Sequence, residues 1–292
     1  MNDHLKGLLI TGLGVLFIVP DSLFVRLIDA DGLTIAFWRN LTSGVFIMLF
    51  VLATQGGSAV ASVVRSGSAG LTYVVFFGTS ATGFVLAVTL TSVANVVFII
   101  ATMPVFAAIL SRIFLGELIS RRMMWTMGGV FVGMAIILAG SQKTAGAHWH
   151  GDLMAVGVAF CFATAMTALR KLRGRPTLPL LPVALIGSAL VLAPFADIMA
   201  PVSGQWWLLL GHGAFITFAS SLMTLGPRYI TSAEVTLLIL LESILAPIMV
   251  WVLLGEDPGQ LTLVGGAVVI VVLLLSNLVV MLQLRRNRML VR

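Results

Sequence analysis

The 292-residue sequence has few charged residues and almost no cysteine. Only 10% of its residues are Asp, Glu, Lys or Arg, while 59% are hydrophobic, and the mean hydropathy is +1.11. Because no soluble domain keeps so apolar a chain in solution, the composition predicts a polytopic membrane protein in contact with lipid. The single cysteine, Cys161, lies in an apolar run, which excludes a disulfide framework and a cysteine-rich metal site.

The sequence also lacks the motifs of common enzymes: phosphate loops, nucleophile elbows, zinc-type helices and paired catalytic carboxylates. We therefore expect no enzyme and no cofactor. His148, His150 and Asp152 have the look of a metal cluster, but a fourth ligand is missing nearby, so we expect no metal. The net charge is +6, yet the basic residues sit in short loops and form no continuous face, so we expect no nucleic acid partner.

Ten apolar windows, each about as long as a helix that crosses a bilayer, follow one another along the chain. They lie at 5–27, 33–54, 69–89, 92–115 and 121–141, and then at 150–171, 177–197, 205–226, 232–254 and 259–282. The predicted fold class is an all-α membrane protein with ten transmembrane helices. The first window has no small-residue cleavage site near its end, so we expect a retained helix rather than a signal peptide.

The fourth and ninth windows repeat each other. SVANVVFIIATMPVFAAILSRIFLGE (92–117) resembles TSAEVTLLILLESILAPIMVWVLLGE (231–256) at an offset of 139 residues. Each copy has a proline near its middle, Pro104 or Pro247, and ends in the letters LGE. A proline inside a membrane helix frees a backbone carbonyl, so we expect the two prolines to act as helix hinges beside a central site.

Weaker matches extend the duplication to the whole chain. An odd number of spans in each copy makes the second copy enter the membrane from the other side, so the two five-helix repeats are predicted to be inverted. We expect the repeats to cover 1–141 and 150–292, with a linker at 142–149. Gly7 and Arg26 of the first window match Gly151 and Arg170 of the sixth.

The distribution of Lys and Arg predicts the orientation. With the N-terminus inside, fourteen of the 17 basic residues fall on the inner side. The positive-inside rule then places both termini in the cytoplasm.

Small residues predict how the halves join. Gly129 and Gly133 share one face of the fifth window, and Gly265 and Gly266 match them in part on the tenth. Such faces let helix backbones approach closely, so we expect these two helices to pack together. A monomer is then sufficient, with a homodimer left open.

Several short motifs together resemble the EamA-type ten-helix proteins of the drug/metabolite transporter superfamily. They are Phe37-Trp38-Arg39-Asn40, the Pro104 helix closing on Leu115-Gly116-Glu117, Gly128-Gly129, and the echo Leu254-Gly255-Glu256. The chain also resembles the YddG-type exporters of aromatic and neutral amino acids. The resemblance implies a secondary carrier in the bacterial inner membrane that exports small metabolites through a cavity between the halves.

Glu242 is the sharpest single candidate because it lies near the middle of the ninth window, just before Pro247. An acid at that depth costs about 2.5–3.5 kcal/mol on insertion scales and usually faces a cavity, a partner or a proton path. We interpret it as the group that binds a substrate's amino group or carries a coupling proton. The alternative is a buried acid hydrogen-bonded to hydroxyls between the repeats.

Other candidates for substrate binding are weaker, because polar side chains in membrane helices often only join helices. Trp38 is either a cavity wall or an interfacial anchor, with Arg39 paired to Asp21, Asp29 or Asp31. The remaining candidates are the polar Asn95, Thr102, Ser80 and Thr82 and the apolar Phe98 and Met103.

We therefore predict an alternating-access exporter of neutral or aromatic amino acids. The alternatives are a multidrug or other metabolite carrier of the same superfamily and, from another class, a non-transporting subunit or an intramembrane enzyme. No Lys or Arg is expected near mid-membrane, which argues against nucleotide sugars as substrates.

Overall fold

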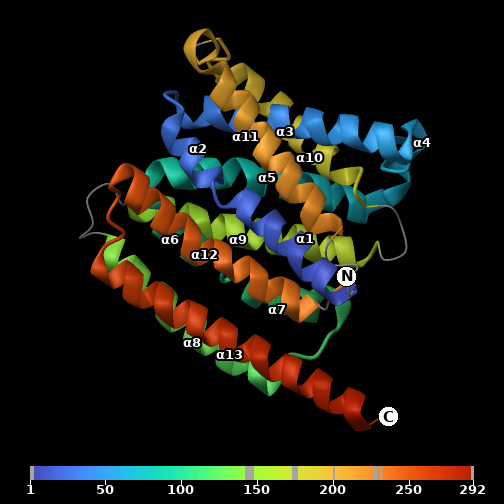
Figure 1. The fold of residues 1–292 in the computed structure, drawn as a ribbon, viewed down its shortest axis with the longest axis vertical. Coiled ribbons are helices and arrows are strands. Elements are labelled where there is room, and N and C mark those ends of the chain that lie inside the picture. Colours follow the sequence, from blue (N-terminus) through green and yellow to red (C-terminus); the bar gives the residue numbers. More distant parts are fainter. Residues whose placement is uncertain are drawn as a thin grey trace.

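A computed structural model describes residues 3–141, 148–172, 177–199, 201–225, 229–230 and 232–290. Most of the predicted linker, 142–147, lies outside the described residues. The first repeat contains α1 (Asp3–Ile18), α2 (Asp21–Leu27), α3 (Gly32–Gln55), α4 (Gly57–Ala61), η1 (Val64–Ser66), α5 (Gly67–Leu90), α6 (Val93–Ile100), α7 (Met103–Leu115) and α8 (Arg121–Ser141). The second contains α9 (Trp149–Arg170), α10 (Leu180–Leu192), η2 (Ala193–Phe195), α11 (Val202–Leu225), α12 (Ser232–Leu254) and α13 (Gln260–Leu290), as Figure 1 shows.

The described part of the chain is helical and contains no strand. Eight of its helical segments are long and apolar enough to cross a membrane, and two further apolar segments, Leu180–Phe195 and Leu238–Leu254, are shorter. These ten segments overlap the ten predicted windows. The all-helical class is therefore confirmed, while the count of ten spans stays a prediction.

The proline of the fourth window marks a real break, whereas that of the ninth does not. α6 ends at Ile100, and Pro104 lies in the first turn of α7, where a missing N–H removes no helical hydrogen bond. Pro247 lies inside the continuous helix α12, between the buried residues Ala246 and Val250. α12 continues through Pro247, so the expected pair of matched breaks is not present.

The first window is also divided, and its break places an acid in the protein interior. α1 ends at Ile18 and α2 begins at Asp21, directly after Pro20. The next helix, α3, begins after Asp31, whose carboxylate accepts hydrogen bonds from the amides of Leu33 and Thr34. Burial raises the pKa of Asp31, but these bonds and one from the Thr34 hydroxyl outweigh it and hold the pKa below its usual value.

The LGE endings have a common structural reason. Gly116 follows α7 with φ 69°, and Gly255 follows α12 with φ 72°. Backbone in this left-handed region favours glycine and ends a helix by turning its last amides back onto earlier carbonyls. Glu117 and Glu256 therefore lie just outside their helices, at equivalent positions of the two repeats.

Contacts between the repeats are reciprocal. α5 packs along α9, and the equivalent pair α11 and α1 also pack together. Gly7 of α1 lies against Tyr229 and Ile230, while the matching Gly151 of α9 lies against Leu90 and Thr91. Related residues thus make related contacts, as expected for a duplicated chain.

The molecule has two ends, which are defined by α6, α7 and α12. The amide of Val93, at the start of α6, donates to the carboxylate of Glu256 (2.7 Å) at the far end of α12. From there α6 and α7 run about 35 Å, at 1.5 Å per residue, toward Glu117. His4 of α1 pairs with Glu234 near the start of α12 (2.7 Å). We call the end with His4 and Glu117 the N-terminal end, and we call the end with Glu256 the far end. In Figure 1, both chain termini lie on one side of the molecule and α2 lies on the other.

α8 and α13 pack against each other through glycines, as the small-residue faces predicted. A side chain on Gly133 would meet Val269 and the carbonyl oxygen of Gly265. A methyl on Gly265 would lie 2.7 Å from the carbonyl oxygen of Gly133 and 3.0 Å from the backbone nitrogen of Ile137. The two backbones can approach so closely only because these positions have no side chain.

We expect Gly265→Ala to separate α8 from α13, because the methyl meets backbone atoms that cannot rotate away. The cost should be about 1–3 kcal/mol, as for other overpacking changes, and should appear as a lower melting temperature of the purified protein in detergent. Gly128→Ala is the matched control, since no heavy atom lies within 4 Å of its added methyl. Equal melting temperatures for the two variants would contradict this packing.

Candidate functional site

A cavity of about 630 Å³ lies between the two repeats, a size suited to a small molecule. Asp21 and Arg39 lie at its inner limit, and Glu117 and Arg170 lie at the N-terminal end. The cavity therefore extends from the interior toward the N-terminal end of the molecule.

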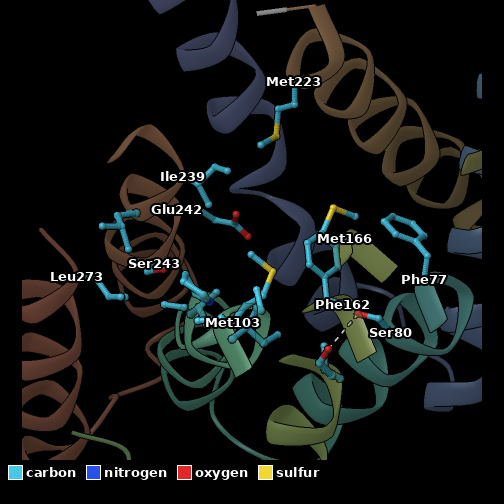
Figure 2. Close-up of a pocket in the computed structure, with 18 of the residues that line it drawn as sticks. Phe77, Ser80, Met103, Phe162, Met166, Met223, Ile239, Glu242, Ser243 and Leu273 are labelled. Carbon is cyan, nitrogen blue, oxygen red and sulfur yellow. Dashed lines mark hydrogen bonds between the residues drawn. The ribbon is translucent and has the colours of Figure 1, made fainter. Parts of the chain in front are cut away.

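Methionine and phenylalanine side chains form much of the wall. In Figure 2, Met103, Met166 and Met223 surround the cavity together with Phe77 and Phe162. They come from α7, α9, α11 and α5, so both repeats contribute. Thioethers and aromatic rings give an adaptable, polarizable surface that suits apolar groups and also attracts cations through the ring faces.

Glu242 projects into this cavity from α12. Its carboxylate points toward the space between Met103, Met166 and Phe162 (Figure 2). Among the described residues no side chain or amide donates a hydrogen bond to it, and no cation pairs with it. A carboxylate in such surroundings is costly unless a proton or a ligand neutralises it. Glu242 is therefore a candidate for binding a proton or a cationic group.

Asp21 has the opposite environment, because its carboxylate is fully engaged. Arg39 of α3 donates to both of its oxygens, at 2.8 and 2.5 Å, and Nε2 of His212 lies 2.6 Å from Oδ1. All three side chains are buried, and the ring of Phe24 stacks on His212 at 5.1 Å. This cluster ties α2, α3 and α11 together. Of the three acids expected as partners of Arg39, the structure selects Asp21.

The expectation that no Lys or Arg lies near mid-membrane stays a prediction, but Arg39 is buried and lines the cavity. The first window bends at Pro20 and brings Asp21 inward, so Arg39 is neutralised in the interior instead of reaching the interface. Arg122 and Arg170 also line the cavity and have partners: Arg122 donates to Ser276, and Arg170 pairs with Glu117.

Of the predicted site residues, Glu242, Ser80, Met103 and the hinge proline Pro104 line the cavity. The Ser80 hydroxyl is 3.4 Å from the carbonyl oxygen of Val158, to which it donates. The structure thus brings one acid, one hydroxyl and one thioether of the predicted set to a common space.

Three predicted residues of the fourth window do not line the cavity. Asn95 is fully buried, donates to Asp152 (2.9 Å) and accepts from Thr262 (2.7 Å). Thr102 is also buried and donates to the carbonyl of Ile99 in the break after α6, while the ring of Phe98 packs on Gly266. Asn95 and Phe98 thus face α9 and α13 and join helices, while Thr102 bonds within its own segment.

Trp38 and Thr82 also lie elsewhere. The indole Nε1 of Trp38 donates to the carbonyl of Ile198 (3.0 Å), which anchors the ring between α3 and the segment after η2. The Thr82 hydroxyl accepts from Asn40 (3.1 Å) and lines a second, apolar groove of about 650 Å³ between α5, α9 and α10. Both side chains therefore have structural contacts outside the central cavity.

Some residues of the site could not be predicted from the sequence. The lining residues Met166 and Phe162 lie in an apolar window like many others, and the lone His212, which binds Asp21, belonged to no pattern. Asp21 did carry a signal, since an acid directly after Pro20 inside an apolar window needs a partner. Among the described residues no group of three or more His, Cys, Asp and Glu side chains is arranged to hold a metal.

The EamA-like transporter family model matches the chain twice, at residues 5–139 and 149–278. The chain belongs to the EamA-like transporter family. As an EamA-like protein it is an integral membrane protein of two repeats, in a family of small-molecule transporters that are generally not enzymes. The family match does not distinguish substrates, so the resemblance to amino acid exporters stays a prediction.

Comparison with solved structures supports the fold of this EamA-like transporter, although the sequence identity is low. Thirteen chains of solved structures match it, and one crystal structure superposes with a TM-score of 0.61 at 18% identity. The alignment covers 97% of this chain and 98% of that chain. No curated protein matches the sequence.

We expect Asp21→Asn to destabilise the transporter strongly, because it leaves the Arg39 charge buried without its partner. Breaking a buried pair costs about 3–5 kcal/mol, whereas replacing both partners is often milder. Asp21→Asn should therefore melt well below the wild type in detergent, and Asp21→Asn with Arg39→Leu should recover part of the loss. Asp29→Asn, at an exposed acid in the loop that follows α2, is the control. A single variant that is as stable as the control would contradict the assignment.

Proposed function

We propose that the protein exports small amphipathic molecules that carry an amino group, by alternating access across the bacterial inner membrane. The observation that supports this proposal is the Glu242 carboxylate, which enters an apolar cavity without a partner among the described residues. An ammonium group would replace the missing cation, and the Met and Phe walls would receive the apolar part.

Neutral and aromatic amino acids are the first substrate class. Their amino group fits Glu242 and their side chains fit a wall that includes Met103, Met166 and Phe162. The hydroxyl of Ser243, which also lines the cavity, is available to the substrate carboxylate, and that of Ser80 would first have to leave the carbonyl of Val158.

Amphipathic cations that lack a carboxylate, such as drugs, are the second class, and one observation favours them. Two of the three arginines in the described lining are paired with acids, Arg39 with Asp21 and Arg170 with Glu117, while Arg122 donates to the neutral Ser276. A substrate carboxylate would thus find only Arg122 without an acid partner in the described lining, whereas a simple amine needs only Glu242.

The same acid would couple transport to protons. If Glu242 binds either a proton or an ammonium group, but not both, each outward step of the substrate is exchanged for an inward step of a proton. Both termini are proposed to be cytoplasmic, from the positive-inside rule. The cavity, which extends toward the N-terminal end, then faces the cytoplasm and receives the molecule to be exported.

The proposal is tested in proteoliposomes with radiolabelled neutral amino acids and, in parallel, a lipophilic amine, with and without an imposed pH gradient. We expect substrate movement that follows the gradient in the wild type. Glu242→Gln keeps the shape of the side chain but not its charge, and should reduce transport at least about tenfold, the equivalent of a lost charge-assisted bond of 1.4 kcal/mol or more. Asp29→Asn is the control for removing an acid outside the cavity.

Each outcome separates the hypotheses. Transport that ignores the gradient would make the protein a facilitated exporter, and transport that survives in Glu242→Gln would remove the proposed role of this acid. Movement of the amine but not of amino acids would select the second substrate class. Liposomes that move no solute would favour a non-transporting subunit.

A further inference from the structure

Two ion pairs join the repeats, one at each end of the molecule. At the far end, Nε of Arg26 in α2 lies 2.9 Å from the carboxylate of Glu256, which follows α12. At the N-terminal end, Nη1 of Arg170 in α9 lies 3.2 Å from the carboxylate of Glu117, which follows α7. In each pair the arginine comes from one repeat and the glutamate from the other.

The duplication relates the two pairs to each other. Arg26 and Arg170 occupy equivalent places, 19 residues after Gly7 and Gly151, respectively. Glu117 and Glu256 each follow a glycine with positive φ at the end of equivalent helices. The two ion pairs are therefore equivalent contacts. In one of them the first repeat supplies the arginine, and in the other the second repeat does.

The far-end pair is held by additional bonds. Arg26 donates to the carbonyl of Thr91 (2.9 Å), and Glu256 accepts from the amide of Val93 (2.7 Å). Both charged side chains are only about a quarter exposed, at 25% and 23%. Arg26 and Glu256 thus tie α2, the end of α12 and the start of α6 together at the far end, and the described lining of the cavity includes neither of them.

The equivalent pair at the N-terminal end is looser. Arg170 and Glu117 are about half exposed, at 46% and 51%, and both line the cavity where it extends toward this end. Among the described residues, the one further partner of these two side chains is the Ser111 hydroxyl, to which Arg170 donates (3.1 Å). The two equivalent ion pairs therefore differ: Arg26–Glu256, at the far end, has additional bonds and is less exposed, which we call the closed form. Arg170–Glu117, beside the cavity, is more exposed, which we call the open form.

We propose that Arg26–Glu256 and Arg170–Glu117 are reciprocal latches, only one of which is closed at a time. When the far end opens, Arg26 and Glu256 separate, and Arg170 and Glu117 take up the closed form. By the equivalence of the repeats, Arg170 would then donate to the carbonyl of Ile230 and Glu117 would accept from the amide of Ser232. This inference rests on the alternating access proposed above.

The test measures which end of the cavity is open, without using a substrate. Ala107 of α7 lines the cavity, so Ala107→Cys in a Cys161→Ser background places one thiol there. A membrane-impermeant thiol reagent is applied from either side of oriented vesicles. We expect Glu256→Gln to raise labelling from the far side relative to the other side about two- to fivefold, as for loss of a partly exposed ion pair. Glu117→Gln should lower the same ratio.

Matched variants make the result specific. Asp257→Asn removes an exposed acid next to Glu256 and should leave the ratio unchanged. The exchange Arg26→Glu with Glu256→Arg should return the ratio toward the wild-type value, because it restores the pair. A Glu256→Gln variant that keeps its labelling from the N-terminal side, and shows no gain from the far side, would overturn the proposal.

A second measurement decides the matter if a charge variant fails to fold. The variant Arg26→Cys with Glu256→Cys is first treated with a short bifunctional thiol cross-linker. The cross-link should then abolish labelling of the Ala107→Cys reporter from the far side. Unchanged far-side labelling after complete cross-linking would reject the latch. Labelling that responds as expected in a protein that moves no amine would keep the latches and reject the proposed substrates, so the two proposals fail separately.

Discussion

The buried carboxylate of Asp21 is the constraint on which the rest of the structure depends. Inside a membrane protein a charge has no water to neutralise it, so its partners must come from neighbouring helices. Pro20 ends α1 and turns Asp21 into the interior, where Arg39 and His212 bind it. Because these three residues come from α2, α3 and α11, their bonds fix the inner limit of the cavity and join the first repeat to the second.

Glu242 is informative because it departs from that rule. Three acids border the same cavity, and the described residues neutralise two of them, Asp21 through Arg39 and Glu117 through Arg170. A chain selected for stability alone would also pair Glu242 or replace it by an apolar residue, since an uncompensated charge in the interior is costly. The cost of the Glu242 charge is compatible with a carboxylate that the bound substrate or a proton neutralises. The contrast between Asp21 and Glu242 therefore separates a structural acid from a candidate transport acid in one site.

The sequence predicts the helices and the repeats well because both depend on local composition. The length of each apolar window defines a span, and the glycine after the last helix of the fourth and of the ninth window defines the LGE ends. Which side chains face the cavity depends on helix rotation, which an almost uniformly apolar helix does not encode. Asn95 and Thr102 were therefore candidates beside Glu242, but Asn95 bonds to Asp152 of α9 and Thr102 bonds to the carbonyl of Ile99 in its own segment. The same limit applies to Pro104 and Pro247, because the sequence does not tell which proline starts a new helix and which lies inside a continuous one.

Inverted repeats with identical packing would make both ends of the molecule alike, so a cavity that extends toward one end requires the repeats to differ. The difference lies where equivalent residues can be compared. The fourth window is broken before Pro104, while its counterpart α12 is continuous, and Arg26–Glu256 has bonds that Arg170–Glu117 lacks. Exchanging these two conformations between the repeats would produce the same structure with the cavity extending toward the other end. Under the proposed alternating access, the duplicated sequence thus supplies two related states without a separate design for each, and the residues that differ between the copies set the balance between them.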